Sequence, residues 1–173
     1  MTYQLNIINE KKYPLIGGLK VKLVKIIELV EKNIGLDSLA WLGNNALSKV
    51  KFKQKKWQLN LVLIDEKQSQ QLNQQYSQKS SPASALTFPF ARFYQKELGA
   101  CEELGDIFLC YPLIQRQILS IHQKDKKNHF QYLLEREILL LFMHGVLHLF
   151  GCDHQTESEK KLIFALQEKI IDL

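Results

Sequence analysis

The sequence HGVLHLFGCDH, from His144 to His154, is the most informative part of the chain for predicting its fold. It contains three of the five histidines in the 173-residue chain. His144 and His148 are four residues apart, so on a helix they lie on one face, one turn from each other. Gly151 is suited to end that helix, and the reversal of the chain brings His154 back toward the other two histidines. Because three imidazoles leave the fourth position of a tetrahedral zinc ion open to water, the spacing predicts one catalytic zinc per chain.

The apolar residues before this stretch predict the helix that carries the first two histidines. Ile138 to Met143 is an uninterrupted apolar run, and a helix that is apolar all round passes through a protein core. We therefore expect a long central helix over His129–Phe150, with a zincin-like metal site near its C-terminal end. The sequence predicts an α+β fold: a single domain over residues 1–173, with a small mixed β-sheet packed with helices. Further strands are expected over Tyr3–Ile8, Trp57–Ile64, Ser84–Phe90 and Asp106–Tyr111, and further helices over Leu19–Asn33, Glu66–Tyr76, Leu113–Ile121 and from Thr156 onward.

Local signals support two of these helices. In the first, apolar residues recur at helical spacing, at Leu19, Leu23, Ile26, Ile27 and Val30. In the second, Asp65 is suited to cap the N-terminus of a glutamine-rich helix. Leu72 and Tyr76 are four residues apart, so we expect this pair to anchor the second helix while its glutamines face solvent.

Gly145, which follows the first histidine, separates this pattern from one class of zinc proteases. Those enzymes share the spacing of the three histidines but carry a glutamate at this position as the general base. Glycine cannot transfer a proton, so a zinc peptidase is the less favoured alternative. A glycine inside a helix also costs about 1 kcal/mol relative to alanine. We therefore expect either another backbone packed closely against Gly145 or space for substrate beside the metal.

With Gly145 in place, the stretch resembles the signature of the YbeY family, H-G-x-L-H-L-x-G-x-D-H. All eight specified positions are matched, by His144, Gly145, Leu147, His148, Leu149, Gly151, Asp153 and His154. The sequence LGDI at Leu104–Ile107 resembles the L-G-D-I strand opening of that family. The sequence LNQQYSQKSSPASALTFP at Leu72–Pro89 resembles its L-N-x-x-Y-R-x-x-D-x-P-T-x-V-L-S-F-P block. The resemblance extends from about residue 60 to the C-terminus.

This resemblance implies an activity, a cofactor and partners. It implies a zinc-dependent endoribonuclease specific for single strands, that is, a hydrolase of RNA phosphodiester bonds. It further implies a role in maturation of the 3′ end of the small-subunit (16S) ribosomal RNA and in ribosome quality control. The expected partners are therefore single-stranded RNA, ribosomal RNA and the small ribosomal subunit, while the oligomeric state is left open.

The second matching block departs from the family pattern at the arginine that follows its tyrosine. This arginine is regarded in the family as important for activity, and a guanidinium can clamp a phosphate with two hydrogen bonds. Here the position is Ser77, which cannot do so. A neighbouring cation, Lys79 or Arg92, is a candidate RNA-binding residue in its place. The alternative is a zinc-stabilised, ribosome-associated binding factor with weak or no nuclease activity.

The sequence specifies the catalytic groups only in part. The candidates are the metal-bound water and Asp153, which is next to His154. A zinc ion lowers the pKa of its water to about 7 and polarises a phosphoryl oxygen. Asp153 is suited either to orient a ligand imidazole or to act as a base. Both a water molecule and the RNA 2′-hydroxyl remain open as the nucleophile.

The charge distribution is compatible with an RNA partner. The formal net charge is +5, which is only mildly basic. Lys49, Lys51, Lys53 and Lys55 alternate, so in an extended chain they share one face. Such a row suits either a solvated edge strand or contacts to phosphates. We expect no membrane association, because no apolar run is long enough to span a bilayer, and a reducing cytoplasm, because the three cysteines form no paired motif.

Overall fold

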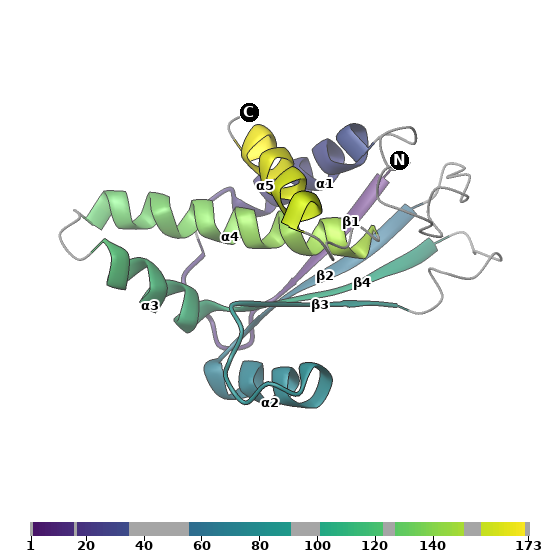
Figure 1. The fold of residues 1–173 in the computed structure, drawn as a ribbon. Helices are drawn as coiled ribbons and strands as arrows, with labels where there is room; N and C mark the ends of the chain where they lie inside the picture. Colours follow the sequence, from purple (N-terminus) through teal and green to yellow (C-terminus); the bar gives the residue numbers. More distant parts are fainter. Residues whose placement is uncertain are drawn as a thin grey trace.

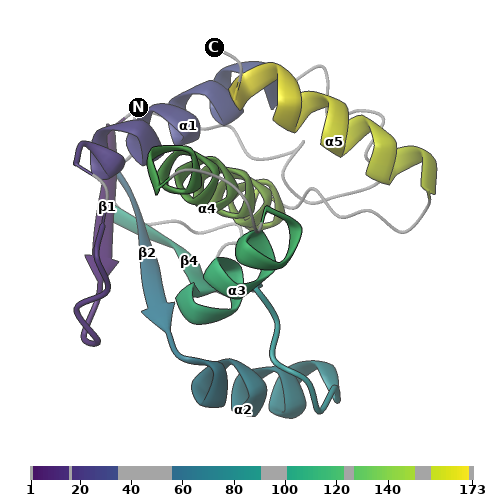
Figure 2. The same ribbon diagram turned by 90° about the vertical axis from the view of Figure 1, so that its left-hand side faces the viewer.

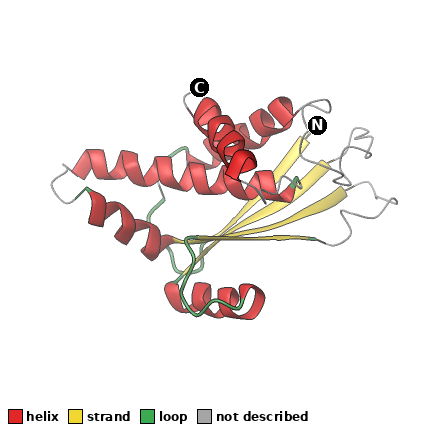
Figure 3. Ribbon diagram, viewed as in Figure 1, coloured by secondary structure: helices red, strands yellow, loops and turns green. Residues whose placement is uncertain are grey.

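The computed structural model describes residues 2–15, 17–34, 56–90, 101–122, 127–150 and 157–171. These residues form four strands and five helices, shown in Figure 1 and coloured by type in Figure 3. In chain order they are β1 (Thr2–Ile8), α1 (Leu19–Ile34), β2 (Lys56–Ile64), α2 (Glu66–Ser77), β3 (Ala85–Pro89), β4 (Cys101–Cys110), α3 (Tyr111–Ile121), α4 (Lys127–Leu149) and α5 (Glu157–Ile171). The predicted α+β class with a small mixed sheet is confirmed.

The four strands form one sheet in the order β1-β2-β4-β3. The pairs β1–β2 and β2–β4 are parallel, whereas β3 pairs antiparallel with β4. The pairing of β2 with β4 shifts between Gln58 and Leu59, which pair with Glu103 and Gly105 and leave Leu104 as an extra residue in β4. Such a bulge bends the strand and increases its twist. Because β3 is last in the strand order, it is an edge strand, and its end at Pro89 pairs with Gly105 beside the bulge of β4.

The helices lie on both faces of the sheet. Figures 1 and 2 show α1, α4 and α5 on one side of it and α2 on the other. The alternation of side chains along β4 agrees with this arrangement, because neighbouring residues of a strand point to opposite faces. Ile107 belongs to the large buried cluster that includes the apolar side chains of α1 and α4. Phe108 packs instead against a small cluster with Leu72 of α2.

The first helix forms for the reason that the sequence predicts. The five residues of its apolar stripe, Leu19, Leu23, Ile26, Ile27 and Val30, are all buried in the main core. The predicted end signal, Gly35, lies outside the described residues. The stripe faces the sheet and α4, so its burial contributes to the same core that holds the long helix. Burying such side chains stabilises the fold by about 1.5–3 kcal/mol each.

The strand β4 is longer than the sequence predicts. The expected strand was Asp106–Tyr111, but β4 begins at Cys101, so the LGDI sequence lies in the middle of the strand rather than at its opening. The parallel pairing with β2 adds these first residues, although glutamates have low β-propensity. At the other end Tyr111 starts α3, because Pro112 occupies the first turn of that helix, where proline is favoured.

The helix α2 is held differently from the prediction. Asp65 caps it as expected, and Gln68 completes a capping box. Of the two expected anchors, Leu72 is half-buried but Tyr76 is 61% exposed. The buried residues are instead Ser69 and Asn73. Their side chains hydrogen-bond to the main-chain oxygens of Ala83 and Ser81 in the loop that follows, so α2 is tied to that loop by polar contacts.

The last two helices of the chain lie close to their predicted positions in the sequence. The predicted helix His129–Phe150 is α4, which runs from Lys127 to Leu149. The helix α5 packs on α4 and α1 through buried residues that include Ile163 and Ile170. Thr156, with which this helix was expected to open, lies outside the described residues. In the described part of the chain, no helix is both long and apolar enough to cross a bilayer.

Candidate metal centre and its surroundings

The structure brings the first two predicted ligands together. His144 and His148 lie one turn apart on α4, and both are half-buried. Their Nε2 atoms are 3.0 Å apart, and their rings meet edge to face with centroids 4.5 Å apart. Two imidazole nitrogens that share a tetrahedral zinc ion lie roughly 3.3 Å apart, given metal–nitrogen distances of about 2.0–2.1 Å. The observed separation is about 0.3 Å shorter and is a hydrogen-bond distance, so a small outward movement of the two rings would let both nitrogens bind one cation.

The other residues predicted for this centre follow the described end of α4. His154 and the candidate catalytic Asp153 lie outside the described residues, as does the proposed helix-ending Gly151. Within the described residues, no group of three or more histidine, cysteine, aspartate or glutamate side chains is arranged to hold a metal. The structure thus supplies two converging nitrogens, and the third ligand stays a prediction.

The position of Gly145 is explained by close packing against the sheet. A Cβ atom at Gly145 would lie 2.9 Å from both Cδ1 and Cγ2 of Ile107. Ile107 is fully buried, so it has little room to move away. Of the two explanations expected from the sequence, close packing is correct, but the neighbour is a side chain of β4 rather than another backbone. The glycine lets α4 approach the sheet at the turn that carries the histidines.

A second glycine, in strand β4, allows the same close contact between α4 and the sheet. Gly105 has φ +148°, and a Cβ there would lie 2.3 Å from the main-chain oxygen of Phe88 and 2.6 Å from Cδ2 of Leu149. Gly105 and Ile107 belong to the LGDI sequence, and Gly145 and Leu149 belong to the histidine stretch. The two motifs that resemble a known family are therefore packed directly against each other.

The position of the family arginine, Ser77, and its candidate substitute Lys79 lie in another layer. Ser77 is the last residue of α2, and Lys79 follows in the α2–β3 loop, where both side chains are exposed. The Lys79 main-chain N–H donates to the Asn73 carbonyl oxygen at 3.3 Å. Because α2 and α4 lie on opposite sides of the sheet (Figure 2), the structure does not place Ser77 or Lys79 in the layer of the two histidines. Arg92 lies outside the described residues.

One carboxyl group on α4 has a shifted pKa. Burial raises the pKa of Glu137, and the nearby Arg136 partly opposes this rise. Glu137 is seven residues before His144 and so lies on the same side of the helix, about 10 Å away along its axis. This spacing is too long for a hydrogen bond to either imidazole, so Glu137 does not serve as a base at the histidine pair.

Comparison with known proteins identifies relatives along nearly the whole chain. The family model described as Endoribonuclease YbeY matches residues 29–173. A protein named Endoribonuclease YbeY from Spiroplasma citri is 34% identical over 118 residues, which cover 66% of this chain and 69% of that protein. A protein of the same name from Malacoplasma penetrans is 29% identical over 171 residues, which cover 99% of this chain and 94% of that protein.

A solved structure shares the fold. The solution structure of TM1509 from Thermotoga maritima superposes with a TM-score of 0.54, at 24% sequence identity. The superposition covers 98% of this chain and 87% of that one. This likeness supports the arrangement of helices around the mixed sheet and carries no further functional argument.

Proposed function

Because the chain belongs to the YbeY endoribonuclease family, we propose that it cuts single-stranded RNA with the help of one zinc ion held by His144, His148 and His154. The observation that supports the metal is the 3.0 Å separation of the two Nε2 atoms on α4. Two neutral imidazoles at this distance suit zinc, for which histidine nitrogen is a preferred ligand.

The proposed chemistry assigns different tasks to the residues around the centre. Zinc, when bound, acts as a Lewis acid toward a phosphoryl oxygen and lowers the pKa of a water molecule to about 7. The three histidines would hold the ion, and Gly145 keeps the helix of the first two seated on Ile107. Asp153 is proposed to orient a ligand imidazole, since such histidines usually donate their other ring N–H to a carboxylate or carbonyl oxygen. Gly145 provides no general base, which argues against a peptidase.

Membership of an endoribonuclease family makes RNA the substrate class. We further propose that the substrate in the cell is the 3′ end of small-subunit ribosomal RNA, in the cytoplasm and in association with the small ribosomal subunit. This assignment rests on the match of the histidine stretch and of the LGDI sequence to the family pattern. The close contact between those two motifs gives a structural reason for their joint presence, because both seat the histidine helix on the sheet.

The metal assignment is tested with single histidine variants. We expect one zinc per chain in the purified protein, and loss of most zinc in the His144→Ala, His148→Ala and His154→Ala proteins. Cleavage of single-stranded RNA should fall at least about 100-fold in each. His129→Ala is the matched control, because His129 is an exposed histidine near the start of the same helix. Full zinc occupancy in the His148→Ala protein would contradict the proposal.

The substrate class is tested with three substrates. Zinc-loaded protein is incubated with a single-stranded RNA, a duplex RNA and casein, and we expect cleavage of the first alone. Cleavage of casein would identify a zinc peptidase instead. If nothing is cut, but the protein binds ribosomal particles with a strong salt dependence, the binding-factor alternative replaces the nuclease.

The loss of the family arginine is tested at the end of α2. If RNA cleavage needs a guanidinium at this position, Ser77→Arg should increase cleavage, and this gain should disappear in a His148→Ala background. If Lys79 already serves this purpose, Lys79→Ala should reduce cleavage, while Ser77→Arg changes it little. Both side chains are exposed, so these substitutions should leave the stability unchanged to within about 0.5 kcal/mol.

A further inference from the structure

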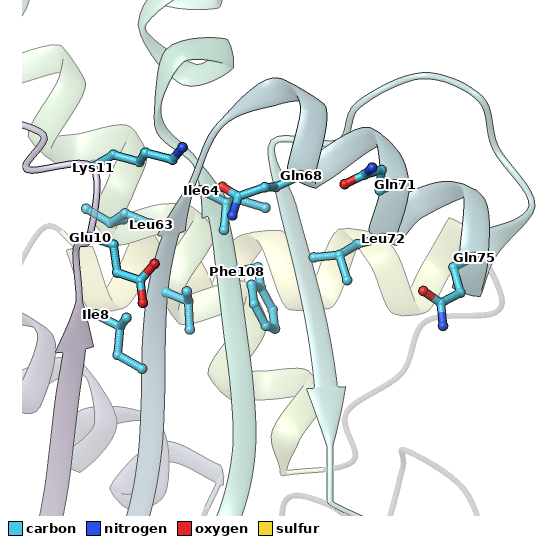
Figure 4. Close-up of a pocket in the computed structure, with 11 residues that line it drawn as sticks. Ile8, Glu10, Lys11, Leu63, Ile64, Gln68, Gln71, Leu72, Gln75 and Phe108 are labelled. Atoms are coloured by element: carbon cyan, nitrogen blue, oxygen red, sulfur yellow. The ribbon is translucent and has the colours of Figure 1, made fainter.

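A groove of about 530 Å³ lies between α2 and the sheet face that points away from α4. Figure 4 shows its side chains. The floor is a row of apolar side chains from three neighbouring strands, Ile8, Val62 and Phe108, which are paired in register. Gln71 and Gln75 approach from α2, and Glu10 approaches from the end of β1. The groove thus has polar groups on two opposite sides of an apolar floor.

Three of the hydrogen-bonding groups at its sides have no partner among the residues that the structure describes. Within the described residues, the side-chain amides of Gln71 and Gln75 make no hydrogen bond, and the Glu10 carboxylate makes neither a hydrogen bond nor an ion pair. Gln68, also on the groove, differs because its side-chain oxygen accepts a hydrogen bond from the Asp65 main-chain N–H. The groove therefore offers two donor–acceptor amides and one acceptor carboxylate to a ligand.

A second row of side chains extends this surface along the sheet. This row consists of Asn6, Asn60 and Asp106. Each of them lies two residues before a floor residue of its own strand and therefore points to the same face of the sheet. Asn6 Nδ2 donates to Asn60 Oδ1 at 2.9 Å, and Asn60 Nδ2 donates to Asp106 Oδ1 at 2.7 Å. The carboxylate of Asp106 keeps acceptor capacity after this bond, since an ionised carboxylate has about four acceptor sites. An apolar row thus adjoins a polar row that ends in a second acceptor.

Aromatic rings border the same surface at β3. Phe108 meets Phe88 edge to face, with ring centroids 5.5 Å apart. Phe88 meets Tyr76 in the same way at 4.8 Å, and Tyr76 is 61% exposed. These contacts hold the three rings in a continuous group from the groove to the edge strand. Rings of this kind provide faces on which unpaired bases stack.

The charges of the groove decide which ligand it fits. Its lysine, Lys11, already pairs with Asp65 at 3.1 Å, and Glu10 adds a negative charge that repels phosphate. A flat neutral ring with donors and acceptors along its edge matches the apolar floor and the amides. The carboxylates of Glu10 and Asp106 are suited to accept hydrogen bonds from an exocyclic amino group. Cytosine, adenine and guanine have such a group and uracil lacks it.

We infer that this groove is a base-binding site for single-stranded RNA, and that it prefers bases with an exocyclic amino group to uracil. The inference rests on the proposed function in that RNA is the chain's substrate. Because the histidine pair lies on the other side of the sheet, a bound strand passes around the sheet to reach it. The groove therefore contributes to affinity for RNA rather than to the chemical step.

The test measures binding without metal. Labelled oligoribonucleotides of equal length, made of cytidine or of uridine alone, and a matching chain without bases are titrated in the presence of a chelator and followed by fluorescence anisotropy. We expect the cytidine chain to bind more tightly than the uridine chain. The Gln71→Ala/Gln75→Ala protein should bind the cytidine chain about tenfold more weakly, because it loses the amide contacts to the base. Glu10→Gln should reduce the preference for cytidine over uridine.

The control is Gln74→Ala, because Gln74 is an exposed glutamine on the same helix that does not line the groove. It should bind every chain as the unaltered protein does. Thermal unfolding of each variant separates loss of binding from loss of folding. Titration with cytidine monophosphate tests the other source of a base: if the monophosphate binds as tightly as the chain, the groove takes a free nucleotide and the RNA assignment is overturned.

Two further results would overturn the inference. One is unchanged binding of all chains by the Gln71→Ala/Gln75→Ala protein. The other is an equal loss for the cytidine chain and for the chain without bases, which would mean contacts to phosphate. The proposed nuclease activity is tested separately. If zinc-loaded protein cuts no RNA but the base-dependent binding persists, the base-binding site is supported and the nuclease activity is contradicted.

Discussion

The two faces of the sheet are packed in different ways. On the face toward α4 the helix and strands meet at contacts so close that they require glycine, at Gly105 and Gly145. On the opposite face α2 is attached by a capping box and by the side chains of Ser69 and Asn73, and a groove remains between it and the sheet. The first arrangement holds the histidine helix in one place, whereas the second leaves polar groups available to a ligand.

This difference is consistent with the distribution of buried side chains. The residues of β2 and β4 that face α4, such as Leu59, Leu61, Ile107 and Leu109, are fully buried. On the other face Asn60, Asp106 and Phe108 are only half-buried. A close-packed interior responds strongly to small changes in volume, so substitutions on the α4 face should have the larger effects on stability.

The largest effect is expected for Gly105→Ala. The added Cβ would lie 2.3 Å from a main-chain oxygen, and the φ of +148° is strained for any other residue. Overpacking and backbone strain each cost about 1–3 kcal/mol, so the free energy of unfolding should fall by about 3 kcal/mol or more. Urea denaturation measures it. Gly17→Ala is the control, because among the described residues no atom beyond its chain neighbours lies within 4 Å of its added Cβ; a similar loss in both proteins would show that the contact is not the cause.

A smaller effect on stability is expected for Gly145→Ala, which tests how closely the histidine helix packs on the sheet. The contact with Ile107 opposes the substitution, while alanine favours the helix by about 1 kcal/mol. We expect a net loss of about 1–2 kcal/mol in the metal-free protein. In an Ile107→Ala background, which itself costs about 2–5 kcal/mol, the same substitution should become neutral or stabilising. Additive losses in this double-mutant cycle would refute the direct contact.

The smallest effect is expected on the open face, for Asp65→Ala. This substitution removes the cap of α2 and should lower the free energy of unfolding by about 1 kcal/mol at neutral pH. The main-chain N–H of Gln68 and then Lys11 hold the pKa of Asp65 below its ordinary value. A lowered pKa in the folded state means that the ionised group stabilises the protein above about pH 3.9 and that this contribution is lost as the pH falls below it.

The difference between the unaltered and Asp65→Ala proteins should therefore shrink in acid, measured by urea denaturation at several pH values. Asp65→Asn is the matched variant, since asparagine also caps a helix but does not titrate in this range. It should keep most of the stability and show little change with pH. A loss above about 3 kcal/mol for Asp65→Ala would mean that the α2 face is as tightly packed as the α4 face.

The features that could be predicted before the fold was known depend on local order along the chain. The spacing of His144 and His148 placed two nitrogens on one helical face, and the stripe from Leu19 to Val30 predicted a buried helix face. Such features follow from the repeat of the helix alone. The three-histidine site that includes His154, and the RNA-binding role of Lys79 and Arg92, are predictions of the sequence that the described residues do not test.

Which residues meet across the sheet could not be predicted from the sequence and depends on the tertiary fold. The contact between Gly145 and Ile107, the early start of β4 and the rows of Asn60 with Asp106 and Val62 with Phe108 all depend on strand order and register. The same is true of the burial of Ser69 and Asn73 in place of Tyr76. The physical reason is that a strand pattern shows which residues share a face, whereas packing between distant segments decides what covers that face.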